Sequence, residues 1–163
     1  MSLHLVQQDI TQMKVDAIVN STNRHMYGFS GVDQLLHSIC GDEFERECEA
    51  LLGKRFPGEA VYTNAYNIPC KYVIHTVSRE WEGGRRGETA IMKSCYRSSL
   101  ELAVELGCES IAFPLISAGS YGYPIAEALK NAVLTISEYL DFTQSCHSET
   151  MLNIRRINQK EES

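Results

Sequence analysis

Three short segments of this chain combine carboxylate or amide side chains with glycine and small polar residues, the types from which small-molecule sites are built. They are Asp9, the stretch 20–33 and the stretch 117–123. Asp33 opens a predicted helix, where a carboxylate can serve as a cap that the helix dipole stabilises by about 0.3–1 kcal/mol. Residues 117–123 precede Pro124, a residue that favours the first helical turn, so their backbone N–H groups can hold an anion.

Each of these segments follows a pattern that predicts a β-strand. Residues 3–9 begin as an alternation of apolar and polar side chains, and residues 15–20 and 110–116 are short apolar runs typical of buried strands. Pro114 has no N–H for the ladder, so we expect it at the strand end or at an irregular pairing position. Because ligands bind at the carboxyl ends of strands in such sheets, the three segments would converge on one rim.

Helical and strand patterns alternate along the rest of the chain. Helical patterns cover about 32–40, 42–52, 88–106 and 124–140, Gly41 and Gly107 are placed to end two of them, and strand patterns cover 60–67, 71–77 and 151–157. This alternation predicts an α/β fold with a mixed, largely parallel central sheet and helices on both sides.

The composition is that of one ordinary globular domain. The 163 residues are 44% hydrophobic and 22% charged, and the net charge of −6 disfavours binding to duplex nucleic acid. No apolar run reaches the ~18–20 residues of a membrane helix, so we expect no membrane contact. The six cysteines are scattered without a Cys-x-x-Cys pair or any other ligand cluster. We therefore expect a cytoplasmic monomer that needs neither metal nor cofactor.

Four groups of residues form a pattern when they are taken together in chain order. They are Gln8-Asp9-Ile10-Thr11; Asn20-Ser21-Thr22-Asn23 leading to Gly28-Phe29-Ser30-Gly31-Val32-Asp33 and His37; His75-Thr76-Val77; and Pro114-Leu115-Ile116-Ser117-Ala118-Gly119-Ser120-Tyr121-Gly122-Tyr123-Pro124. Over about residues 3–140 this combination resembles the macrodomain family of ADP-ribose-binding and ADP-ribose-hydrolysing modules. The resemblance implies a three-layer α/β/α domain over residues 1–157, followed by a frayed tail at 158–163.

The resemblance also implies which residues contact ADP-ribose. Asp9, beside Ile10, would accept a hydrogen bond from the exocyclic amine of adenine, and its alternative role is a cap or an Asx turn. Asn23 would bond the hydroxyls of the distal ribose, while Asn20 would be structural and bond loop backbone. Backbone N–H groups in the stretch 117–122 would hold the diphosphate. The full implied set is Asp9, Ile10, Asn23, Gly31, Val32, Ser117, Ala118, Gly119, Ser120 and Tyr121.

The implied catalytic group is Asp33 with Asn23 and His37. Asp33 would face the distal ribose and orient or activate a water, and Tyr121 would cover the ribose and confine that water. His37 lies one helical turn after Asp33 and would tune it, touch the substrate or simply pack. The implied substrates are O-acetyl-ADP-ribose and proteins mono-ADP-ribosylated on Asp or Glu.

The chain departs from the family pattern in two places, and the first keeps a second function open, that of a non-catalytic ADP-ribose reader. Phe29-Ser30 stands where hydrolytic members carry a glycine run, so these side chains would crowd the ribose or reshape the water site. The C-terminal part shows no residue that can be assigned to stacking on adenine. We therefore expect a hydrolase, with the reader as the alternative.

Overall fold

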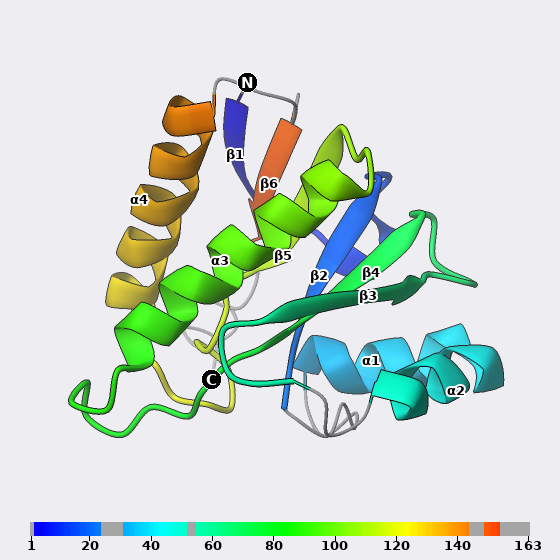
Figure 1. The fold of residues 1–163 in the computed structure, drawn as a ribbon, viewed down its shortest axis with the longest axis horizontal. Helices are drawn as coiled ribbons and strands as arrows, with labels where there is room; N and C mark the ends of the chain where they lie inside the picture. Colours follow the sequence, from blue (N-terminus) through cyan, green and yellow to red (C-terminus); the bar gives the residue numbers. More distant parts are fainter. Residues whose placement is uncertain (1, 24–30, 52–54, 144–148, 154–163) are drawn as a thin grey trace.

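The sheet that carries the polar segments is mixed and largely parallel. A computed structural model describes residues 2–23, 31–51, 55–143 and 149–153, and within them one sheet has the strand order β1-β6-β5-β2-β4-β3 (Figure 1). The strands are β1 (Ser2–Val6), β2 (Ala17–Thr22), β3 (Ala60–Asn64), β4 (Tyr72–Val77), β5 (Ser110–Pro114) and β6 (Glu149–Asn153). Each neighbouring pair is parallel except β3 with β4. The predicted sheet type is therefore confirmed.

Helices cover both faces of this sheet. They are the 3-10 helix η1 (Ile10–Gln12) and the α-helices α1 (Gly31–Cys40), α2 (Asp42–Leu51), α3 (Glu88–Glu105) and α4 (Ile125–Thr143). Alternate residues of β2 serve the two faces, since Ala17 and Val19 pack in the core with α3 and α4 while Ile18 packs with α1 and α2. Figure 1 shows the two helix pairs on separate parts of the sheet. This is the predicted three-layer α/β/α arrangement. Within the described residues, none of these helices combines the length and apolar composition of a membrane span.

Strand β2 runs two residues further than its apolar pattern predicts. Ser21 and Thr22 continue the ladder by pairing with Thr76 and Val77 of β4, so the predicted strand end at residue 20 is wrong. The apolar run that predicts the strand ends before these residues, because residues 21 and 22 are polar. The extension matters for the site, because it places the side chain of Thr22 on the same face of the sheet as residue 20.

Strand β6 lies between β1 and β5 and pairs in parallel with both. It covers Glu149–Asn153 rather than the predicted 151–157. Thr150 and Asn153 are buried polar residues, which explains why the apolar pattern is weak there. The predicted tail at 158–163 lies outside the described residues.

Three local predictions about where elements end are confirmed. Gly41 and Gly107 follow α1 and α3 with φ values of +81° and +73°, the left-handed conformation that suits glycine after a helix. Pro114 is the last residue of β5, where its missing N–H leaves the ladder intact.

Candidate functional site

A cavity of about 380 Å³ opens where β2 and β5 end and α1 begins. Its lining comes from all three sources: Ser21, Thr22, Asn23, Val32, Asp33, Pro114, Leu115, Ser117, Gly119, Ser120 and Tyr121. The place agrees with the general rule that ligands of α/β sheets bind beyond the carboxyl ends of the strands. The volume lies within the range of small-molecule sites, about 300–1,000 Å³.

The Asp33 carboxylate is held in a fixed orientation in the wall of this cavity. Its side chain is almost wholly buried. Asn20 Nδ2 donates to Asp33 Oδ1 at 2.7 Å, and Thr22 Oγ1 donates to Asp33 Oδ2 at 2.9 Å. Because Asn20 and Thr22 are two residues apart on β2, both side chains reach the same helix start. The expectation that Asn20 bonds loop backbone is wrong, since its amide donates to the carboxylate instead.

His37 lies behind Asp33, away from the cavity. Its Nε2 is 3.4 Å from Asp33 Oδ1, and its Nδ1 is 2.5 Å from Oε1 of Glu45 on α2. Burial lowers the pKa of His37, but the two carboxylates outweigh it, so its pKa is raised above 6.5. Of the three roles left open for His37, the geometry shows a contact with Asp33 and packing against the Phe44 ring, whose centroid is 5.2 Å away.

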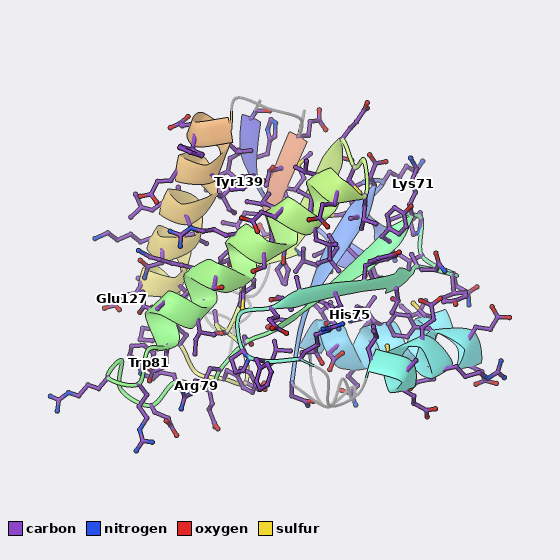
Figure 2. All side chains as sticks on the ribbon, viewed as in Figure 1. Lys71, His75, Arg79, Trp81, Glu127 and Tyr139 are labelled. Atoms are coloured by element: carbon purple, nitrogen blue, oxygen red, sulfur yellow. The ribbon has the colours of Figure 1, made fainter. Side chains whose placement is uncertain are left out.

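His75 joins the same network from β4. Figure 2 shows it between the sheet and the helices α1 and α2. Its Nδ1 is 3.2 Å from Asn20 Nδ2 and its Nε2 is 3.0 Å from Thr63 Oγ1. Burial lowers the pKa of His75 to about 4, so the ring is neutral at neutral pH. Since the amide nitrogen of Asn20 can only donate, His75 Nδ1 accepts, and His75 Nε2–H donates to Thr63. His75 is thus a packing residue that also fixes Asn20.

The loop 117–123 forms the opposite wall and is closed by its own backbone hydrogen bonds. Tyr123 N–H donates to Ser117 O at 3.0 Å, and Gly122 N–H donates to Gly119 O at 3.0 Å. Ser117 has a φ of +65°, a conformation that costs free energy for a residue other than glycine. The surrounding bonds therefore hold a strained turn at the edge of the cavity.

The segment 81–86, here called the Trp81 brace, holds this loop from outside. The backbone N–H of Trp81 donates to Tyr121 O at 2.8 Å, and the Trp81 indole packs on the Tyr123 ring with centroids 4.5 Å apart. Figure 2 shows Trp81 near the start of α3. The Glu88 carboxylate accepts three backbone N–H groups from the stretch 82–86. Burial raises the pKa of Glu88, but these bonds outweigh it and lower the pKa to about 2. The brace is thus anchored on α3.

Comparison with known proteins decides the family. The model of the macro domain family matches residues 19–132. A macro domain-containing protein from Chlorobaculum tepidum is 45% identical over 138 residues, which are 85% of this chain and 80% of that protein. The chain belongs to the macro domain family. The O-acetyl-ADP-ribose deacetylase of Citrobacter rodentium is 45% identical to this macro domain over 141 residues, 85% of this chain and 80% of that enzyme.

Solved macrodomain structures share the fold. The Oceanobacillus iheyensis macrodomain with ADP superposes on this macro domain with a TM-score of 0.86 and 30% identity, over 98% of this chain and 90% of that one. A variant of the same protein with ADPR superposes with a TM-score of 0.85 and 30% identity, over 98% and 92%. These likenesses support the three-layer architecture along almost the whole chain.

Most of the predicted site residues meet at the cavity of this macro domain. Those that line it are Asn23, Val32, Asp33, Ser117, Gly119, Ser120 and Tyr121. Ala118 is instead buried in the core with α3 and α4, and Gly31 is the first residue of α1. Gly28 and Phe29-Ser30 lie outside the described residues.

Asp9 and Ile10 lie beyond the cavity lining, at η1. Asp9 Oδ1 accepts from Thr11 N at 3.0 Å and from Thr11 Oγ1 at 2.7 Å, so the capping role left open for Asp9 is present. The Asn153 side chain forms two hydrogen bonds with the backbone of Gln8, the residue before Asp9. Asn153 Oδ1 accepts from Gln8 N at 3.3 Å, and Asn153 Nδ2 donates to Gln8 O at 2.8 Å. An adenine contact of Asp9 stays a prediction.

Sequence reasoning missed two side chains that hold the site, Thr22 and Glu45. The period of two along β2 would have found Thr22 once Asn20 was chosen, had the strand been extended. The Glu45 contact joins α1 to α2 and depends on how the chain turns at Gly41, which the residue pattern does not define. Among the described residues, no group of three or more potential metal ligands comes together.

Proposed function

We propose that this macro domain binds ADP-ribose in the cavity and hydrolyses ADP-ribosyl esters. The substrate class is O-acetyl-ADP-ribose or proteins mono-ADP-ribosylated on Asp or Glu. The observation that carries the proposal is a buried carboxylate, Asp33, which two hydrogen bonds hold in the wall of a cavity that Ser117, Gly119 and Ser120 also line. The name of the 45% identical Citrobacter enzyme supports the same chemistry.

Different residues of the cavity bind the diphosphate and the distal ribose. The loop that holds Ser117, Gly119 and Ser120 precedes α4, where backbone N–H groups and the helix dipole favour the diphosphate. Asn23 and Tyr121 flank the distal ribose, which Asn23 bonds through its amide. Once the diphosphate is fixed, the ester is held close to Asp33, which converts binding energy into orientation.

Asp33 acts on a water by orienting it. Its Oδ1 contacts Asn20 and His37, whereas Oδ2 accepts from Thr22 and has a second site for the water, because a carboxylate offers about four sites. The held water attacks the anomeric or acyl carbon, the ester C–O bond breaks, and the proton passes to the departing oxygen. The products are ADP-ribose and a free carboxylic acid.

The test is a time course of ADP-ribose release from a protein mono-ADP-ribosylated on glutamate and from O-acetyl-ADP-ribose. Wild type is compared with Asp33→Ala and with Asp141→Ala, an exposed carboxylate near the end of α4. We expect Asp33→Ala to lower the rate by about 10²–10⁴-fold, the usual contribution of a positioned acid–base group, and Asp141→Ala to leave it unchanged.

Calorimetric binding of ADP-ribose to the same samples separates the possible outcomes. A hydrolase keeps most of its ligand affinity in Asp33→Ala while turnover collapses. Binding of ADP-ribose by wild type without its release from either substrate would contradict catalysis and make the protein a reader. The absence of both binding and release would overturn the assignment of the cavity.

A further inference from the structure

We propose that Glu45 is a positioning residue that keeps His37 as an imidazolium clamped between two carboxylates and so fixes Asp33 in the cavity wall. Its catalytic consequence rests on the proposed function. The charge state of His37 does not, and it can be measured on the protein without any ligand.

The three side chains form a line from the protein surface to the cavity. Glu45 on α2 is the outer end, with 41% of its side chain exposed, and Asp33 on α1 is the inner end, with 5% exposed. His37 lies between them at 11%. The Glu45 Oε1 to His37 Nδ1 distance is 2.5 Å, and the His37 Nε2 to Asp33 Oδ1 distance is 3.4 Å. The line connects two helices whose junction is the left-handed Gly41.

The two carboxylate contacts favour the charged form of the ring. A neutral imidazole has one N–H and one lone pair, whereas ionised carboxylates can only accept. If His37 were neutral, one ring nitrogen would point a lone pair at either Asp33 or Glu45. Only the imidazolium presents an N–H to both. The inner contact is longer than a hydrogen bond and is an ion pair, which depends on that charge.

The other titratable groups near Asp33, His37 and Glu45 are uncharged at neutral pH. His75 on β4 is neutral, because burial lowers its pKa to about 4. Burial raises the pKa of the Cys40 thiol to about 11 and that of the Cys48 thiol to about 12. The Phe44 ring meets the imidazole edge-on with centroids 5.2 Å apart. Among the described residues, the charges that face His37 are therefore those of Asp33 and Glu45.

The charge on His37 matters because Asp33 must share the cavity with a diphosphate. A buried carboxylate beside an anionic ligand is destabilised by repulsion unless a cation lies close to it. His37 supplies that cation, and Glu45 stabilises it from the solvent side. Above the pH at which His37 loses its proton, Asp33 faces the ligand without compensation.

The experiment measures the titration of His37 by NMR in wild type, Glu45→Gln and Glu49→Gln. Glutamine keeps the shape and an acceptor oxygen at residue 45 but removes the charge. Glu49 is one turn further along α2 and exposed, so it is the matched control. We expect the wild-type midpoint above 6.5, and a fall of about 1 pH unit in Glu45→Gln, at the low end for a neighbouring charge because Glu45 is partly exposed.

The second readout is the pH profile of kcat for ester hydrolysis. Glu45→Gln should move the upper, alkaline limb down by the same interval as the NMR midpoint, so that kcat on that limb is several-fold lower than wild type at the same pH. Glu49→Gln should move neither readout. An unchanged His37 midpoint in Glu45→Gln, or an unchanged alkaline limb despite a moved midpoint, would overturn the proposal. If wild type shows no turnover, the proposed hydrolase function fails, and the NMR midpoint alone then decides whether Glu45 holds the charge.

Discussion

Replacing Thr22 by valine tests how much of the site depends on the orientation of the Asp33 carboxylate. Valine keeps the branched shape of threonine and removes the hydroxyl that donates to Asp33 Oδ2 at 2.9 Å. A hydrogen bond to a charged group is worth about 1.5–3 kcal/mol. Both side chains are nearly buried, but Asp33 also faces the cavity, where water can partly replace the lost donor. We therefore expect a loss near the lower end, about 1.5 kcal/mol.

That loss should appear in two measurements on Thr22→Val. Urea unfolding should give a free energy lower by about 1–2 kcal/mol. The kcat for ester hydrolysis should fall by about tenfold, because a carboxylate held by one hydrogen bond instead of two positions the attacking water less well. Thr22→Ser is the matched control, since it keeps the hydroxyl and should retain most of the turnover.

A double-mutant cycle with Asp33→Ala separates the bond from other effects of Thr22. Once Asp33 is absent, Thr22→Val should cost about 1–2 kcal/mol less of unfolding free energy than it does in wild type. Equal costs in the two backgrounds would mean that the Thr22 hydroxyl acts elsewhere, and the reasoning about Asp33 would be wrong.

Two further predictions follow from buried groups near the site. The pKa of His75 is about 4 in the folded protein and about 6.5 in the unfolded chain, so between these pH values the unfolded state binds a proton that the folded state does not. The neutral His75 therefore contributes fully to the free energy of unfolding above pH 6.5. This contribution, up to about 3 kcal/mol, is lost as the pH falls toward 4. Urea midpoints from pH 7 to 4 check this, and a His75→Gln variant with the same pH slope as wild type would contradict it. Asn153→Leu should loosen the Gln8–Asp9 backbone and weaken AMP binding by about tenfold. Ribose 5-phosphate, which lacks adenine, should bind it as it binds wild type, and an equal loss for both ligands would place the effect elsewhere.

Much of the fold could be predicted because its signals are local. The apolar runs that become β2 and β5 are buried on both faces, and such runs are visible in one sequence. The glycines that end α1 and α3 are equally local. The polar residues at the ends of strands could not be predicted in this way. The side chains of Thr22 and Asn153 point into the protein and form hydrogen bonds there, so the alternation of apolar residues does not extend to them.

The candidate site could be predicted where the chain itself brings residues together. Asn23 and Asp33 lie ten residues apart, one directly after β2 and the other in the first turn of α1, and the loop 117–123 follows the neighbouring strand β5. By contrast, the Glu45 contact depends on the angle between two helices, and the core position of Ala118 depends on the fold of a strained turn. Such contacts follow from packing in three dimensions, and neither spacing nor composition contains them.

The loop 117–123 is ordered before any ligand arrives, because its bonds are made within the protein. Tyr123 closes it onto Ser117, and Trp81 holds it from outside. The ordering entropy of this wall is therefore lost during folding and not during binding. A ligand that meets a rigid wall keeps more of its interaction energy as affinity. A substitution of Trp81 would weaken binding by returning that entropy to the loop, although Trp81 is not one of the residues that line the cavity.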